Sequence, residues 1–377
     1  MPLRATPSDV CAGCFEDEDL RDWIESVDGE PGCGFCGKND FSTAPLDEVV
    51  DFIRERIKTF YSQAIDELSH DSGEGGYEGS TYDTEDILFF RMELELPRDE
   101  DEELRDAILE PLRDEEPWCE YDPARVDPDE GMILDWERFS HIVKYERRFF
   151  FHKRGEKRED FFDESLSPRQ LLRAIARSIN ERELFADLAT GYRIFRARIP
   201  GSGYRLTSAR DFGPPPSDCA TQWNRLNPPG IPVLYASENA ALAAAEVGEG
   251  GCVIGEFEAV RDLRLLDLAD LPRLPGVFSG ASRDDFMAMR FLHTFSDLIV
   301  QPVDREDRTV LDYIPTQVFT EFLRDFRFDG GPICGIKYRS ASGLSGANLA
   351  LFATQEHVAD PGEETEHTWL RLTDVEW

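Results

Sequence analysis

The chain has 377 residues, of which 77 are acidic and 41 basic, so its formal net charge is −36. This length allows two or three domains with a sizeable core. Because phosphate backbones bind positive surfaces, the charge balance argues against free DNA or RNA as the main ligand.

The basic residues are strongly biased, since only six of the 41 are lysine. An acidic surplus that avoids lysine is typical of a protein that stays hydrated in concentrated salt, where repulsion between its charges is screened. A merely acidic protein from ordinary salt is the alternative. The sequence has neither a leader-like start nor an apolar stretch of membrane-spanning length, so we expect a cytoplasmic protein without membrane contact.

The first segment, residues 1–40, contains two C-x-x-C pairs formed by Cys11, Cys14, Cys33 and Cys36, with 18 residues between the pairs. Four thiolates at this spacing predict a closed, structural Zn²⁺ site, and disulfides are the alternative. The other cysteines are predicted to be small buried hydrophobic residues: Cys119, Cys219, Cys252 and Cys334.

Residues 41–188 are predicted to form a mostly helical domain. Between Pro45 and Leu68, apolar residues recur at intervals of three and four, which indicates one buried helical face. Further elements are expected at 84–96, 100–113, 135–151 and 167–188, and Ser167–Pro168 should begin the last of them. The run 114–131 is rich in turn residues, and 152–165 is a charged linker.

From Tyr192 onward, short β-rich segments replace the helical pattern. They are YRIFRARI, VLYAS, CVIGEFEA, LRLLDL, ICGIKYRS, NLALFAT and TWLRLTDV, with helices expected at 238–247, 283–297 and 315–326. This order predicts an α+β fold for residues 189–377. A Rossmann or P-loop fold is excluded, because no Gly-rich phosphate loop follows a strand.

The stretch from Asn224 to Glu246 is the most informative part of the chain. It contains a loop with Arg225, a short apolar strand, and an alanine-rich helix with Glu246 just before Gly248 ends it. The small alanines allow close packing, which would place Tyr235, Ser237 and Glu246 around one narrow space. The alternative is an ordinary helix with Glu246 on its solvated face.

This stretch resembles the RES domain, a family named for arginine, glutamate and serine. Arg196 in YRIFRARI and the serines of YRSASGLSGANLALF complete the resemblance, which spans roughly residues 190–355. The resemblance implies an ADP-ribosyltransferase-like fold, in which two small sheets are splayed around a cleft. It also implies that the protein cleaves the bond between nicotinamide and ribose of NAD⁺.

The resemblance assigns roles to several residues. Glu246 would stabilise the ribosyl cation, and Arg196 and Arg225 would bind the diphosphate. Tyr235 would stack on nicotinamide, and Ser237 would lie beside it. Ser340 matches the family serine best, with Ser342 as the alternative. Arg225 is the weaker match of the two arginines, since Gln222, Trp223 and Asn224 precede it where the family usually has glycine and arginine.

Three polar residues lie before and within the last predicted helix. Tyr313, Thr316 and Gln317 lie where free N–H groups could meet an anion, although an ordinary helix cap is the favoured interpretation. The acceptor of the ribosyl group stays open between water, phosphate and a macromolecule.

The helical segment resembles the HEPN class of domains, which precede RES domains. HEPN nucleases use an Arg-x(4–6)-His pair, and Arg147 and His152 have that spacing. A rival function is therefore an RNA-cleaving or interaction module with a degenerate C-terminal cleft. RES proteins are often toxins restrained by an antitoxin, so a cognate antitoxin or another regulatory protein is an expected partner.

Overall fold

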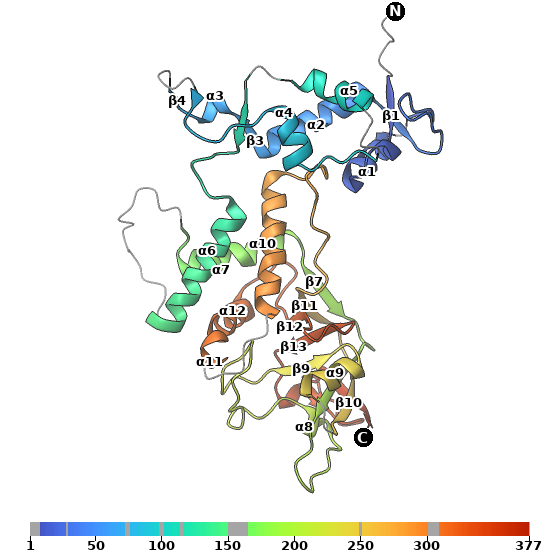
Figure 1. Cartoon of the computed structure of the whole chain (residues 1–377). Coiled ribbons are helices and arrows are strands. Elements are labelled where there is room, and N and C mark those ends of the chain that lie inside the picture. Colours follow the sequence, from blue (N-terminus) through green and yellow to red (C-terminus); the bar gives the residue numbers. More distant parts are fainter. Residues whose placement is uncertain are drawn as a thin grey trace, which may run out of the picture. The chain divides into compact units, whose positions relative to one another are not determined.

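The computed structural model describes residues 8–27, 29–71, 76–97, 102–113, 116–149, 165–248, 251–300 and 309–376. Its contacts divide the chain into two compact units (Figure 1). The first comprises 1–129 and 273–290, and the second 130–272 and 291–377. This grouping differs from the predicted segments 1–40, 41–188 and 189–377, which followed changes of sequence pattern and not contacts.

The first unit is mainly helical, with short paired strands. Its main helices are α1 (Glu18–Val27), α2 (Leu46–Phe60), α3 (Ala64–Glu67), α4 (Thr84–Asp86), η2 (Ile87–Arg91) and α5 (Glu102–Leu112), and η1 (Ala12–Cys14) is a short turn. The strand pairs are β1 (Asp9–Cys11) with β2 (Thr43–Pro45), β3 (Tyr61–Gln63) with β6 (Trp118–Glu120), and β4 (His70–Asp71) with β5 (Gly76–Tyr77).

The helix predicted from Pro45 to Leu68 is interrupted, which corrects the sequence interpretation. Helix α2 ends at Phe60, and Tyr61 and Gln63 join the strand pair with Glu120 and Trp118. Ile65, expected on the buried face, is 56% exposed. A partner strand far along the chain thus overrides the local helical periodicity.

The core of the first unit includes residues from distant parts of the sequence. Val10 and Phe15 from the cysteine-rich segment pack in the same cluster as Ile53 and Ile108 from the helical segment. Phe278 is fully buried in this cluster. The neighbouring chain is tied down too, because Gly276 N donates to Asp19 and Arg56 donates to the carbonyl of Val277. Residues 273–290 are therefore an integral part of the first unit.

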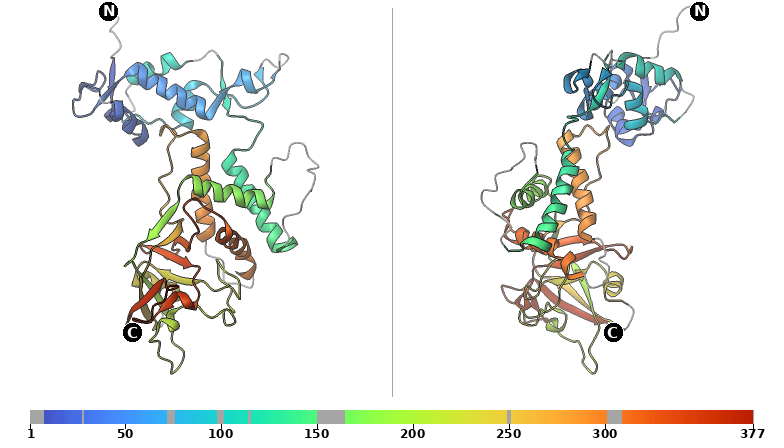
Figure 2. Two further views of the ribbon diagram at one scale, coloured as in Figure 1. Left: turned by 180° about the vertical axis from the view of Figure 1, so that it is seen from behind. Right: turned by 60° about the vertical axis from the view of Figure 1, so that its left-hand side comes forward.

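The second unit combines helices with one large sheet. Its helical elements are α6 (Pro128–His141), which begins at the end of the first unit, η3 (Ile142–Glu146), α7 (Pro168–Glu181), α8 (Ala209–Phe212), α9 (Ala240–Val247), α11 (Thr309–Asp312), α12 (Ile314–Asp325) and the C-terminal part of α10 (Arg283–Val300). Trp136 of α6 packs edge-on against Phe295 of α10 and Phe319 of α12. Figure 2 shows these helices from two further sides.

The described residues contain a nine-stranded sheet in the order β14-β15-β10-β8-β9-β13-β12-β11-β7. The strands are β7 (Phe185–Leu188), β8 (Arg193–Arg198), β9 (Leu234–Ser237), β10 (Val253–Ala259), β11 (Leu263–Asp267), β12 (Gly335–Arg339), β13 (Ala347–Leu351), β14 (Val358–Ala359) and β15 (Leu370–Glu376). Strands β8 and β9 are joined by a single residue pair, Phe195 with Ser237. The sheet is therefore almost divided at this point.

Most predicted elements of the second unit are confirmed. Every β-rich segment expected after Tyr192 contains a strand, the expected helices correspond to α9, α10 and α12, and Ser167 caps α7 with Gln170. The α+β class is thereby confirmed. Two predictions are wrong. Residues 185–188 form β7 and not a helix end. Of the cysteines predicted to be buried in this unit, Cys219 is exposed in a turn, and Cys252 and Cys334 are only half-buried.

None of the described helices combines the length and apolar character needed to cross a bilayer.

Candidate active site and metal centre

Glu246 lies in the last turn of α9 and contacts two neighbouring strands. The helix begins at Asn239, whose side chain accepts a hydrogen bond from Leu242 N, and it ends at Gly248 with φ 86°. Ser340 Oγ and Asn348 Nδ2 both donate to Glu246 Oε1, each at 2.6 Å. Oε2 has no hydrogen-bond donor among the described residues, so it is the oxygen available to a ligand. Glu246 is exposed, but these contacts hold its carboxylate against the sheet.

A row of polar side chains on adjacent strands supports this carboxylate. Ser237 and Tyr338 lie directly opposite Asn348 on its two sides, so the three share one face of the sheet. Ser237 Oγ donates to Asn348 Oδ1 at 2.7 Å. Asn348 and Ser237 are only 4% and 3% exposed, so this pair is fixed within the sheet.

Asn348 is a site residue that the sequence interpretation missed. It is the first residue of the predicted strand NLALFAT, where a polar residue in an otherwise apolar run is the available signal. Between the two candidate serines, Ser340 is the one that contacts Glu246, while Ser342 Oγ lies 2.9 Å from Ser340 Oγ. Ser342 therefore supports Ser340.

Tyr338 is the third member of this row. Burial raises its pKa, the nearby charge of Glu246 raises it further, and the charge of Arg225 acts in the opposite direction. Tyr338 is therefore close enough to both charged residues to respond to them, and it stays a neutral phenol.

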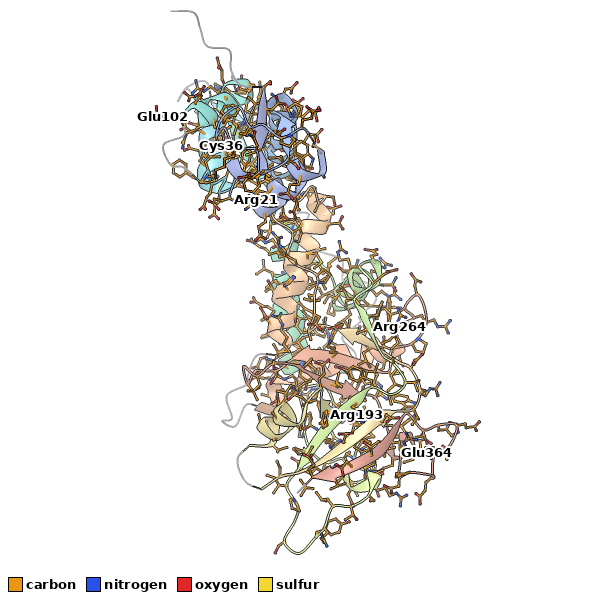
Figure 3. All side chains as sticks on the ribbon, turned by 90° about the vertical axis from the view of Figure 1, so that its right-hand side faces the viewer. Arg21, Cys36, Glu102, Arg193, Arg264 and Glu364 are labelled. Atoms are coloured by element: carbon orange, nitrogen blue, oxygen red, sulfur yellow. The ribbon has the colours of Figure 1, made fainter. Side chains whose placement is uncertain are left out.

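Arg196 is a cation for which the described residues provide no hydrogen-bond or ion-pair partner. Its Nη1 atom is out of contact with solvent and has no hydrogen-bond acceptor among the described residues. Two other arginines of β8 differ, since Arg193, labelled in Figure 3, pairs with Glu256, and Arg198 donates to the carbonyl of Gly213. Burial lowers the pKa of Arg196 to about 9, the charge of Arg198 adds to this, and Tyr235 opposes it. Arg196 thus lies near Tyr235 and is still protonated at neutral pH.

Arg196 is half-buried, and its surroundings explain why its Nη1 atom is out of contact with solvent. Gly255 of β10 lies opposite Arg196, so the two positions share a face of the sheet. A Cβ atom at Gly255 would lie 2.6 Å from the ring of Phe212, which is fully buried. An aromatic ring therefore covers the sheet beside the guanidinium. An unpaired cation in such a place costs several kcal/mol, which an anionic ligand would offset.

Arg225 lies in the loop that connects to β9. Its Nη1 donates to the carbonyl of Ile299, and its guanidinium lies 5.8 Å from the ring centre of Tyr313. Burial raises the pKa of Tyr235, and Arg225 is among the charges that act against this rise. Arg225 therefore belongs to the same neighbourhood as Tyr235 and Tyr338.

The residues at the start of α12 contact this loop with their side chains. Thr316 Oγ1 donates to the carbonyl of Arg225, and Gln317 Nε2 donates to that of Asn224 at 2.7 Å. Thr316 also donates to Tyr313 O at 2.9 Å, as expected of a residue in the first turn of a helix. Their contacts are thus with the protein chain, which agrees with a structural role.

The four N-terminal cysteines converge in the first unit, where Figure 3 labels Cys36. Their sulfur atoms all lie within 4.8 Å of one another, and the closest separations are 3.5, 3.6 and 3.7 Å. Four sulfurs at about 2.3 Å from one Zn²⁺ would be separated by about 3.8 Å, so the geometry fits a tetrahedral metal. The four residues could therefore hold a metal ion.

The environment of these thiols also favours a cation. Burial raises the pKa of Cys11 to about 11, with a further contribution from its contact with Cys36, and burial likewise raises the pKa of Cys14. Cys33 differs, because its burial is outweighed by backbone hydrogen bonds, which lower its pKa to about 7. Thiolates at Cys11 and Cys14 are therefore unfavourable unless a metal compensates their charge.

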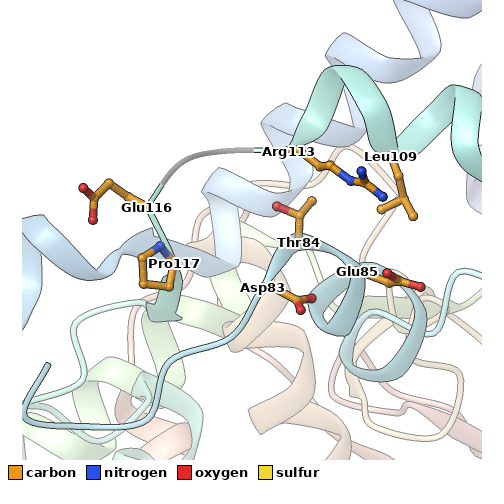
Figure 4. A pocket seen from close by; sticks show the side chains of 7 residues that line it. All are labelled: Asp83, Thr84, Glu85, Leu109, Arg113, Glu116 and Pro117. Carbon is orange, nitrogen blue, oxygen red and sulfur yellow. The ribbon is translucent and has the colours of Figure 1, made fainter. Parts of the chain in front are cut away.

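A pocket of about 460 Å³ also lies in the first unit (Figure 4). Its acidic lining residues have other partners: Asp83 caps α4, Glu85 pairs with Arg105, and Glu116 accepts from Tyr77. These carboxylates stabilise local structure, and the pocket contains none of the residues predicted for catalysis.

Of the predicted Arg147–His152 pair, only Arg147 is among the described residues. Arg147 lies directly after η3 and its Nη1 is 3.4 Å from Glu146 Oε2. His152 lies outside the described residues.

Two models of known protein families match the chain. Residues 26–157 match the family model of HEPN/RES N-terminal domain 1, and residues 192–373 match the model of the RES domain. The chain is a RES-domain protein with an N-terminal HEPN/RES domain, as the resemblance predicted. Searches of curated proteins and of solved structures returned no match.

Proposed function

We propose that the second unit cleaves the nicotinamide–ribose bond of NAD⁺ and thereby acts as a toxin or defence effector. The observation that carries the proposal is the pair of donors, Ser340 and Asn348, on a single oxygen of Glu246. The RES family is associated with NAD⁺-utilising activity. In the same unit, Arg196 supplies a cation whose Nη1 has no acceptor among the described residues. It lies on the face of the sheet opposite Asn348, because its neighbour Phe195 is the residue that pairs with Ser237. The nearly divided sheet supports an ADP-ribosyltransferase-like arrangement.

In the proposed reaction, the bond between C1 of the ribose and the nicotinamide nitrogen breaks, and nicotinamide leaves as a neutral base with the electron pair. The ribosyl group becomes an oxocarbenium-like cation, which Glu246 Oε2 stabilises electrostatically. An acceptor oxygen then bonds to C1 and loses its proton. Glu246 is the carboxylate in position to hold that proton when the acceptor is water.

The other side chains have binding or orienting roles in this proposal. Ser340 and Asn348 fix Oε1 and so aim Oε2. Arg196 and Arg225 bind the diphosphate, since guanidinium groups match its charge and geometry. The hydroxyl of Tyr235 donates to Asn227 at 2.8 Å, so its ring face is the part offered to nicotinamide.

Two further features complete the proposal. The four-cysteine cluster holds Zn²⁺ structurally, because all four positions are sulfur and no place is left for a reactive water. The acceptor of the ribosyl group is water or phosphate in a free-standing enzyme, and a macromolecule in a transferase. A cognate antitoxin or regulatory protein would restrain such an activity in the cell.

The test is incubation of the purified full-length protein with NAD⁺ in concentrated salt while free nicotinamide is quantified. We expect release by the wild type and not by Glu246→Ala. Product analysis with and without phosphate then identifies the acceptor. If neither protein releases nicotinamide while RNA is cleaved, and that cleavage is lost in His152→Ala, the helical segment is the active one and this proposal is wrong.

A further inference from the structure

The loop that carries Arg225 is held by buried side chains of α12. Gln317 Nε2 donates to the carbonyls of both Asn224, at 2.7 Å, and Asn227, at 3.2 Å. Gln317 is 4% exposed, and Thr316, which donates to Arg225 O, is 8% exposed. Since both ends of the loop 224–227 are bonded to one amide, the backbone around Arg225 has little freedom.

Asn227 ties the same loop to the strand that carries Tyr235. Its Oδ1 accepts from the Tyr235 hydroxyl at 2.8 Å, and its Nδ2 donates to Ile231 O at 2.8 Å. The Tyr235 oxygen in turn accepts from Leu226 N at 3.2 Å. Asn227 is 3% exposed, so these bonds are protected from competing water.

Because the loop is fixed, the guanidinium of Arg225 also has a restricted position. One of its nitrogens is used by the Ile299 carbonyl, and the ring of Tyr313 lies beside it. The other guanidinium nitrogens have no hydrogen-bond acceptor in the part of the chain described. A long arginine side chain on a mobile loop would lose conformational entropy on binding an anion, whereas one on a fixed loop has lost part of it already.

We propose that Gln317 and Asn227 are positioning residues, which hold Arg225 and Tyr235 in one arrangement for a ligand that contains a diphosphate. This inference rests on the proposed function and extends it to two residues that do not themselves contact the substrate. Gln317 acts on the backbone of the loop, and Asn227 acts on the Tyr235 hydroxyl. The positions of the Tyr235 and Arg225 side chains are thereby coupled through a single loop.

A double-mutant cycle tests this inference. The dissociation constant of ADP-ribose is measured by calorimetry in concentrated salt for the wild type, Gln317→Met, Arg225→Lys and the double variant. We expect each single variant to weaken binding about 10-fold. Gln317→Met leaves Arg225 misplaced, and Arg225→Lys removes its guanidinium. The double variant should then bind within about 2-fold of Arg225→Lys alone, since the two changes remove one effect.

Thr320→Val is the matched control. Thr320 is buried on the same helix and donates to Thr316 O, so its loss removes a comparable bond without touching the loop carbonyls. Thermal unfolding is recorded for every variant. If Gln317→Met does not fold, Asn227→Leu takes its place in the cycle with the same expected coupling.

The outcomes separate this inference from the function on which it rests. If the effects of Gln317→Met and Arg225→Lys multiply, or if Thr320→Val weakens binding as much, Gln317 is only structural and the inference is overturned. If the wild type binds no ADP-ribose, the proposed function fails and the inference fails with it. A wild type that binds, with strongly coupled variants, supports both.

Discussion

Asn348 donates a 2.6 Å hydrogen bond to Glu246, although 102 residues separate them in the sequence. Asn348 is buried within the sheet, whereas Glu246 lies on an exposed turn of α9. The bond therefore connects the rigid sheet with the carboxylate that we propose to be catalytic. Several predictions about the site depend on this connection.

Replacement of Glu246 by glutamine should lower kcat for nicotinamide release by about 100-fold or more, because the charge beside the ribosyl cation is lost. The free energy of unfolding should change little, since Glu246 is exposed and glutamine keeps an oxygen that can accept the hydrogen bonds from Ser340 and Asn348. Glu364→Gln, which alters a carboxylate paired with Arg371, is the control and should retain activity. Equal activity of Glu246→Gln and wild type would show that the charge of Glu246 is not needed for the reaction.

Asn348→Leu should reduce kcat about 10-fold, because Oε1 of Glu246 loses one of its two donors. The variant should also be destabilised by about 1–3 kcal/mol, since the buried hydroxyl of Ser237 loses its acceptor. Adding Ser237→Ala should recover part of this stability without recovering activity. Urea unfolding and nicotinamide release measure the two effects separately, and a double variant less stable than Asn348→Leu would contradict the argument.

Arg196→Met should leave the free protein equally stable or more stable by about 1–3 kcal/mol, because a half-buried guanidinium with a buried nitrogen that lacks an acceptor is removed. The same variant should bind ADP-ribose at least about 10-fold more weakly, since the anion loses its partner. Arg193→Met, on the same strand but paired with Glu256, should change neither property much. A large loss of stability in Arg196→Met, measured by denaturant unfolding, would show that Arg196 is structural.

Zinc removal should loosen the first unit, including residues 273–290, which belong to it although they lie late in the sequence. Elemental analysis should find about one zinc per chain. Chelation should then speed cleavage by trypsin after Arg273, because Arg273 and Gly276 are held by Asp19 of α1, close in sequence to the cysteines. The cleavage site is identified by mass spectrometry. A chelated protein that resists cleavage there would show that the metal does not hold this segment.

Local sequence patterns determined a large part of this protein. Alternating apolar residues gave strands such as β10 and β15, and the C-x-x-C spacing brought four sulfurs together, because both signals act over a few residues. The alanines before Glu246 and the terminating Gly248 also defined α9 correctly. For the candidate site, the sequence supplied Glu246, Arg196 and Ser340.

Only the tertiary structure decided which of these residues meet and what surrounds them. The chain leaves α2 for β3 because a strand 55 residues further on offers hydrogen bonds, counted from Gln63 to Trp118. Asn348 reaches Glu246 through sheet register, Gln317 reaches the Arg225 loop through helix packing, and Phe278 joins the core of the first unit. Such contacts depend on the simultaneous packing of distant segments, which no local periodicity encodes.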